Sequence, residues 1–213
     1  MCTELITACI GLLGTAVGGF ATYAVQTTIE KNRVKQRKEA LTAALYGEIY
    51  SLLHLAEVRN YLGMIMSVTS CIQENKFYPP HEHFFTMNLQ GYFDIYRNNS
   101  KFIGEIDSDI APKISSFYVN VFSLLEDMLT QPGEAYRLAH TAFGETLIAK
   151  QSYVNSLYKG LINDMLLFCQ SINVGQEICE TLSKRYSYKY EPVFKNIAQL
   201  KAKIDKFKDL KWE

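Results

Sequence analysis

The residues best suited by type to metal or acid–base chemistry are His81-Glu82-His83, two histidines on either side of a glutamate. Alternate side chains of an extended segment point to the same side, so these two imidazoles could share a metal ion. A third ligand would have to come from elsewhere in the chain, and the preceding Pro79-Pro80 predicts an exposed loop, which explains the same residues without a metal. We therefore expect no metal site and no cofactor.

Patterns of known catalytic sites are absent from the rest of the sequence. It has no GxxxxGK[ST] phosphate loop, no GxGxxG, no HExxH and no GxSxG nucleophile elbow. Glu126 and Asp127 are adjacent, so on a helix they point to different parts of its surface and make a poor acid–base pair. We expect no catalytic residue, no enzyme activity and no small-molecule substrate.

The five cysteines stand at positions without paired spacing, namely Cys2, Cys9, Cys71, Cys169 and Cys179. An odd number of cysteines without a CxxC pair is a poor basis for disulfides or a zinc ribbon. We expect buried, unreactive thiols in a reducing compartment.

The strongest signal is an uncharged run of 21 residues from Leu5 to Val25. As a helix this run spans about 31 Å, which matches a bilayer core of about 30 Å. Only Glu4 precedes it among charged residues, whereas the following KNRVKQRK at 31–38 has five basic residues and no acid. The positive-inside rule then predicts a single-pass membrane anchor over 1–30, with the N-terminus outside and the bulk of the chain cytoplasmic.

Small residues recur at every fourth position of this run, along two ridges of the predicted helix. Small residues at this spacing let two helix backbones approach closely within lipid. We expect self-association or pairing with another membrane helix, through Gly11, Gly14, Thr15, Gly18, Gly19 and Thr22.

Basic residues follow the anchor directly, at Lys31, Arg33, Lys35, Arg37 and Lys38. Each can gain about 1 kcal/mol from anionic lipid at the membrane surface. We expect residues 31–74 to form a basic stalk that continues into the first long helix of the soluble part.

Residues 75–213 predict a cytoplasmic bundle of antiparallel helices, so the fold class is all-α. Gln131-Pro132-Gly133 predicts a tight turn, and Gly175 predicts the end of a helix. In the last helix, an apolar stripe with steps of 4, 3, 4 and 3 lies opposite a lysine-rich face: Val193, Ile197, Leu200, Ile204 and Phe207. Packing on the bundle is the expectation for this helix; docking on a membrane and contact with nucleic acid are the alternatives.

Residues 92–128 carry a local pattern of an aromatic, an Asn, an Ile-Gly step and an Ala-x-x-Ile-x-x-Phe-Tyr helix. The matching positions are Phe93, Asn98 or Asn99, Ile103-Gly104, Ala111, Ile114 and Phe117-Tyr118. With the anchor and the basic stalk, the chain resembles small bacterial single-pass membrane proteins of largely unknown function, which include transmembrane effectors of retron-type anti-phage systems. After Ile-Gly the common pattern has small apolar residues or prolines, whereas this chain has acidic residues within 105–109.

The resemblance implies a non-enzymatic effector of a retron-like, abortive-infection system that acts on the inner membrane when its partner releases it. That partner would be a protein or ribonucleoprotein regulator such as a reverse transcriptase complex, and the lipid bilayer would be the target. The alternative is a membrane-tethered interaction or scaffold protein without toxic activity, with the aromatic segment 77–102 as its docking surface.

The formal net charge is zero, with 22 basic and 22 acidic residues, which argues against a dedicated nucleic-acid binder. The charges are nevertheless segregated. Residues 39–183 carry 8 basic and 16 acidic residues, whereas residues 184–213 carry 9 basic and 4 acidic residues. The C-terminal segment could therefore touch a phosphate backbone, although the whole chain is neutral.

Overall fold

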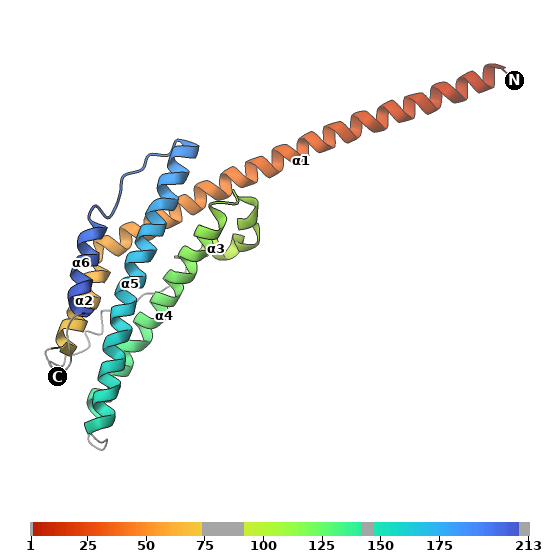
Figure 1. The fold of residues 1–213 in the computed structure, drawn as a ribbon. Helices are drawn as coiled ribbons and strands as arrows, with labels where there is room; N and C mark the ends of the chain where they lie inside the picture. Colours follow the sequence, from red (N-terminus) through yellow and green to blue (C-terminus); the bar gives the residue numbers. More distant parts are fainter. Residues whose placement is uncertain (1, 74–91, 142–146, 209–213) are drawn as a thin grey trace. The chain divides into compact units, whose positions relative to one another are not determined.

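The computed structural model describes the backbone of residues 2–73, 92–141 and 147–208, and the side chains of 15, 17–70, 92–127 and 155–206. Within these ranges the regular elements are all helical, which confirms the all-α class (Figure 1). They are α1 (Cys2–Val58), α2 (Tyr61–Gln73), α3 (Asp94–Asn99), a 3-10 turn η1 (Ser100–Glu105), α4 (Ala111–Thr141), α5 (Leu147–Tyr186) and α6 (Ile197–Lys208).

The chain divides into two compact units, Met1–Ala43 and Ala44–Glu213. The first unit consists of the N-terminal part of α1. The second contains the end of α1 and all the other helices. The anchor boundary expected after residue 30 and the bundle boundary expected after residue 74 remain predictions from the sequence.

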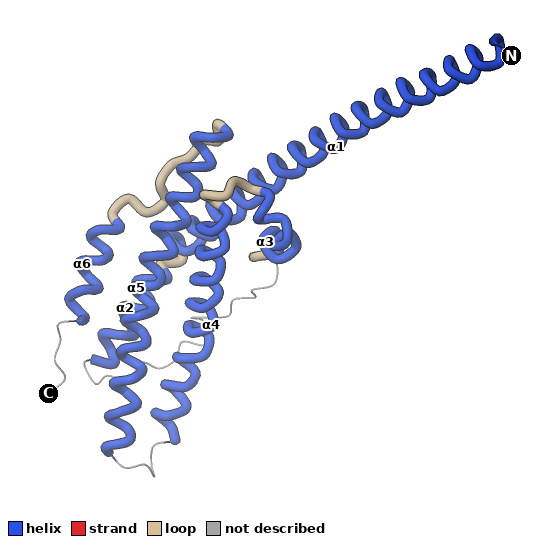
Figure 2. Tube along the Cα trace, turned by 45° about the vertical axis from the view of Figure 1, so that its right-hand side comes forward, coloured by secondary structure: helices blue, strands red, loops and turns tan. Residues whose placement is uncertain are grey.

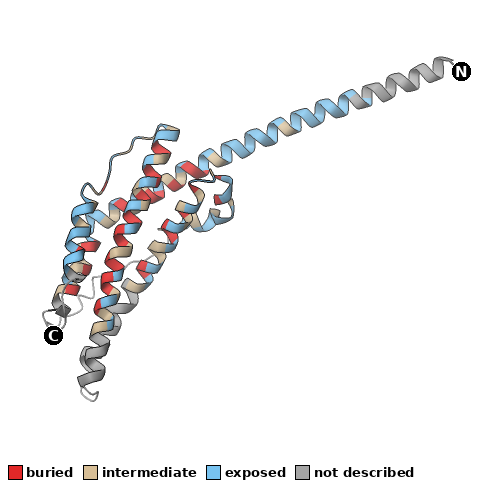
Figure 3. Ribbon diagram, viewed as in Figure 1, coloured by how far each residue is buried: buried red, intermediate tan, exposed pale blue. Residues whose placement is uncertain are grey.

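In the second unit α5 is the central helix, with its most extensive packing against α4 and further packing against α2 and α6 (Figure 2). Buried positions recur along the facing sides of these helices (Figure 3). The fully buried side chains include Leu45, Ile49, Ile114, Phe117, Tyr118, Met165, Ile178 and Leu182. Helical spacing of apolar residues places them on one face, and burial of each large side chain stabilises the unit by about 1.5–3 kcal/mol.

Both helix breaks expected from glycine and proline are wrong. α4 continues through residues 131–133 to Thr141, so Pro132 leaves one backbone donor missing from this helix without ending it. α5 continues through Gly175, where a Cβ atom would lie 2.7 Å from Phe117 Cε2 and 3.1 Å from Leu53 Cδ2. Gly175 is therefore a position of close helix packing rather than a helix end.

The C-terminal helix packs against α5, as the apolar stripe predicts. α6 lies against α5, with Ile204 fully buried and Val193, just before the helix, also buried. The lysines Lys201, Lys203 and Lys206 are on the exposed side of the same helix.

Candidate functional site

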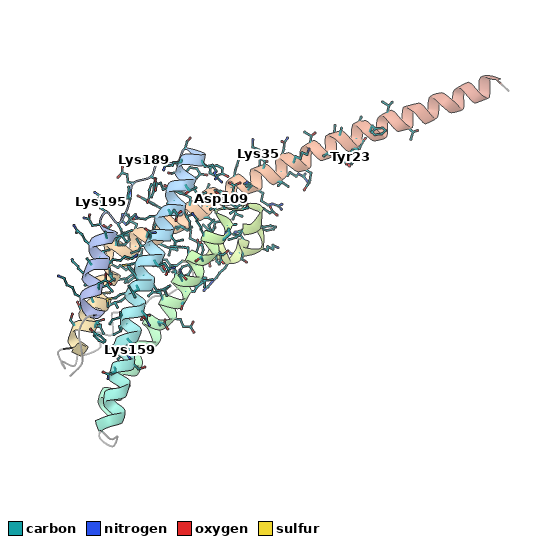
Figure 4. The ribbon with its side chains drawn as sticks, viewed as in Figure 1. Tyr23, Lys35, Asp109, Lys159, Lys189 and Lys195 are labelled. Carbon is teal, nitrogen blue, oxygen red and sulfur yellow. The ribbon has the colours of Figure 1, made fainter. Side chains whose placement is uncertain are left out.

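The N-terminal part of α1 exposes large apolar side chains within a short stretch. Their exposed fractions are 67% for Val17, 77% for Phe20, 69% for Tyr23, 57% for Val25 and 47% for Ile29. Single exposed apolar residues are normal on a soluble protein, but a contiguous set usually marks a surface that is covered by a partner or by lipid. In Figure 4, Tyr23 extends away from the helix with no other element of this unit beside it.

The threonine hydroxyls of this stretch are satisfied within the helix. Thr22 Oγ1 donates to the carbonyl of Gly18 at 2.9 Å, and Thr27 and Thr28 donate to the carbonyls four residues earlier at 2.8 Å. Hydrogen bonds of this kind remove the need for water at the hydroxyl. They lower the free-energy cost of placing these residues in an apolar medium, where an unsatisfied donor is expensive.

Among the small residues expected to pack against another helix, Gly18 and Gly19 lie in open space. A Cβ atom at either position would meet no atom within 4 Å. Gly18, Thr22, Val25 and Ile29 follow one another at steps of 4, 3 and 4 and share one face of α1. Thr15 is exposed as well, whereas Gly11 and Gly14 lie outside the residues whose side chains are described.

The five basic residues after the apolar stretch lie on the surface of α1. Lys31, Arg33, Lys35 and Arg37 are exposed, and Lys38 is half-buried. The Nζ atom of Lys35 lies 4.0 Å from a carboxylate oxygen of Glu39, one turn further along the helix. Exposed pairs of this type contribute little to stability, so an anionic surface can compete with Glu39 for Lys35.

The part of the chain whose side chains are described contains no helix long and apolar enough to cross a membrane. The first half of the anchor predicted over 1–30, through Gly14, lies outside that part.

A second site, which the sequence did not reveal, is centred on Glu48 in the buried part of α1. One Glu48 oxygen accepts the backbone N–H of Ile95 at 2.9 Å. The other accepts the N–H of Tyr96 at 3.2 Å and the hydroxyl hydrogen of Tyr118. A buried carboxylate is tolerated when charge-assisted hydrogen bonds replace its water, and here three donors converge on it.

Tyr118, a donor to this carboxylate, belongs to a cluster of aromatic rings. Tyr96 stacks on Tyr118 with ring centroids 3.9 Å apart, and Phe93 meets Phe122 edge-on at 4.7 Å. The Arg97 guanidinium lies 5.2 Å from the centre of the Phe122 ring. Burial first, and then the Glu48 carboxylate, raise the pKa of Tyr118 far above its ordinary value, so its hydroxyl is a permanent donor at neutral pH.

Among the residues that carry the resemblance, Tyr118 donates to this carboxylate, and most of the others lie in the core of the same unit. Phe93, Ile103, Ile114, Phe117 and Tyr118 are all buried, and the Asn99 side chain donates to the carbonyl of Ile95 at 2.8 Å. The local pattern is therefore a packing arrangement that holds α3 against α1 and α4. Within the segment 77–102, Phe93 faces the core, whereas Asp94, Arg97 and Lys101 are exposed; residues 77–91 lie outside the described part, so the docking surface stays a prediction.

The acidic residues that depart from the common pattern contact the end of α5. Arg185 pairs with the Asp107 carboxylate and lies 3.2 Å from a carboxylate oxygen of Asp109. These hydrogen bonds raise the pKa of Arg185, because both carboxylates favour its charged form. The acidic stretch thus joins the loop before α4 to the end of α5.

Groups that could do chemistry are sparse in the described part. It holds no cluster of three or more His, Cys, Asp or Glu side chains of the kind that binds a metal ion, and His81-Glu82-His83 lies outside it. Cys169 and Cys179 are free and buried, as expected. Burial raises the pKa of both thiols, to about 12 for Cys179, so neither is a reactive thiolate at neutral pH.

Comparisons with protein-family models, with curated proteins and with solved structures find no match to this chain.

Proposed function

We propose that the N-terminal part of α1 anchors the protein in a bacterial inner membrane. The observation that carries this proposal is the exposure of Val17, Phe20, Tyr23, Val25 and Ile29 on a helix whose next turns carry basic residues. Lipid would cover the apolar side chains, and anionic headgroups would meet the lysines and arginines. The soluble part, proposed as an antiparallel bundle, then lies in the cytoplasm.

The protein acts there as a non-enzymatic effector. Several copies associate through the face of α1 that carries Gly18, Thr22, Val25 and Ile29, which we call the glycine face. The cluster disturbs the membrane and stops growth. A regulatory partner prevents this clustering until it releases the soluble part. The anti-phage setting, with a regulator such as a reverse transcriptase complex, rests on the resemblance of residues 92–128 and of the anchor and stalk to retron-type transmembrane effectors.

Membrane fractionation and a voltage-sensitive dye test this function in bacteria that express the full chain. Phe20→Lys places a charge on the apolar stretch, and Val119→Lys is the matched control because Val119 is 61% exposed on α4. We expect the full chain and the control to sediment with membranes, resist an alkaline wash and depolarise the cells. We expect the Phe20→Lys protein to be released and harmless.

Toxicity that persists in the soluble Phe20→Lys protein would contradict a membrane effector. A full chain that sediments with membranes but leaves growth and potential unchanged would favour the tethered scaffold instead.

A further inference from the structure

Five half-buried tyrosines form a continuous surface on the second unit, which we call the tyrosine strip: Tyr46, Tyr50, Tyr186, Tyr188 and Tyr190. Tyr46 and Tyr50 stand one turn apart on α1 with nearly parallel rings 6.0 Å apart. Tyr188 lies 4.9 Å from Tyr46 and stacks at 5.8 Å on Tyr186, and Tyr190 meets Tyr50 edge-on at 6.2 Å. The strip therefore joins two segments that are far apart in the sequence.

Backbone contacts fix the strip in place. The Tyr46 hydroxyl donates to the carbonyl of Lys189 at 2.7 Å, and the N–H of Tyr188 donates to the carbonyl of Ser183 at 3.1 Å. Ser187 has a φ of 58°, a left-handed conformation that turns the chain at the end of α5. This turn leads the chain from Tyr186 into Tyr188, so that both rings join the strip.

Lysines are interleaved with these tyrosines. Residues 184–196 contain four basic residues and one acid. The side chains of Lys184 and Lys189 are 74% and 90% exposed and pair with Glu180 at 2.7 Å and Glu191 at 3.5 Å. Exposed pairs of this type are weak, so a phosphate group can replace the glutamate at little cost. Lys189 and Lys195 both extend from this region of the surface in Figure 4.

We infer that the tyrosine strip binds single-stranded nucleic acid, with bases against the tyrosine rings and phosphates at Lys184, Lys189 and Lys195. Aromatic rings beside a basic track are what unpaired strands require, because every base has a stacking face and every nucleotide a charge. A duplex keeps its bases stacked on one another, so it offers no base face to the tyrosine rings.

A lipid surface fits this region less well. Insertion at an interface needs exposed aliphatic or large apolar side chains together with basic ones. In the described part of the chain such exposed side chains lie on the N-terminal part of α1 and at Val58 and Val119, none of them on the strip or in 184–196.

The test is fluorescence anisotropy with the full chain in nanodiscs of neutral phosphatidylcholine. The probes are a fluorescein-labelled mixed-sequence RNA of about 20 nucleotides, the DNA of the same sequence, and the corresponding DNA duplex. We expect saturable binding of at least one single strand, weakened by salt, and binding of the duplex that is at least about tenfold weaker.

Two variants probe the two parts of the surface. Lys184→Gln/Lys189→Gln should reduce the salt slope by roughly 1.4, as expected for two lost phosphate contacts on a single strand. Its matched control is Lys101→Gln/Lys159→Gln, because both lysines are exposed. Lys159, on α5, lies far from Lys189 (Figure 4). Tyr186→Ala should weaken binding about fivefold or more, and Tyr186→Phe should restore it.

The inference is overturned if neither single strand binds at low salt, if the duplex binds equally well, or if the lysine variant behaves like its control. It is also overturned if residues 184–196 gain hydrogen-exchange protection in nanodiscs containing phosphatidylglycerol without any oligonucleotide, since lipid would then be the ligand. This inference does not depend on the proposed membrane effector.

Discussion

The Glu48 carboxylate on α1 accepts the hydroxyl hydrogen of Tyr118, a fully buried side chain on α4. The same carboxylate accepts two backbone N–H groups at the start of α3. One charged side chain therefore joins three helices, and each of its partners would be left without an acceptor if it were lost.

Replacing Glu48 by Ala should lower the free energy of unfolding by about 2–4 kcal/mol, because three donors lose the acceptor that they share and a cavity remains. Glu57→Ala is the control, since Glu57 is an exposed glutamate on the same helix and should change the free energy by less than about 0.5 kcal/mol. Urea unfolding followed by circular dichroism measures both. Equal losses in the two variants would show that the Glu48 junction contributes nothing of its own.

The stability of the protein should fall in alkaline solution. Burial favours the neutral phenol of Tyr118 and raises its pKa above the ordinary 10.0, so the folded state keeps a proton that the unfolded chain releases. The free energy of unfolding therefore decreases as the pH rises above about 10, by up to about 1.4 kcal/mol per pH unit for each such group. Tyr46, Tyr158 and Tyr190 act in the same direction.

Tyr118→Phe isolates this effect. The variant should be less stable than the parent at pH 7 because Glu48 loses a donor, but its stability should fall less steeply between pH 10 and about 11. Chemical unfolding at several pH values measures the slope. An unchanged slope would mean that the Tyr118 proton does not contribute.

Gly175→Ala should destabilise the second unit by about 1–3 kcal/mol. The added methyl group would lie 2.7 Å from the Phe117 ring, and the ring is itself buried in the core and has little space to move. Gly47→Ala is the matched control, since its Cβ would meet no atom within 4 Å and should stabilise α1 by up to about 1 kcal/mol. Thermal unfolding should shift in opposite directions for the two variants, and a shift in the same direction would contradict the packing argument.

The sequence was sufficient for the helical class and for much of the core, because both follow from local periodicity. Leu41, Leu45 and Ile49 recur at helical spacing, and all three are buried. The two predicted helix ends were wrong because they rest on the local preferences of proline and glycine. At Gly175 the tertiary packing of Phe117 and Leu53 decides the conformation instead.

The junction around Glu48 and the tyrosine strip could not be predicted from local sequence patterns. Glu48 meets a residue 47 positions away, and Tyr46 meets the backbone of one 143 positions away. For the junction around Glu48, the sequence offers one signal: a charged residue stands between Leu45 and Leu52 on the apolar face of its helix. A buried charge of that kind must have partners, but its sequence neighbours do not say which.

The exposed glycine face of α1 gives a last prediction, for association in membranes. Gly18→Ile fills the open space beside the backbone and should prevent the close approach of a second helix, whereas the folding of the second unit should be unaffected. Ala24→Ile is the control, because Ala24 is exposed on the same helix about 120° around its axis from Gly18. Crosslinking in membranes should show a loss of association for the first variant alone. Association that survives Gly18→Ile would mean that the copies meet through another face, and clustering through the Gly18 face would then have no part in the proposed effector function.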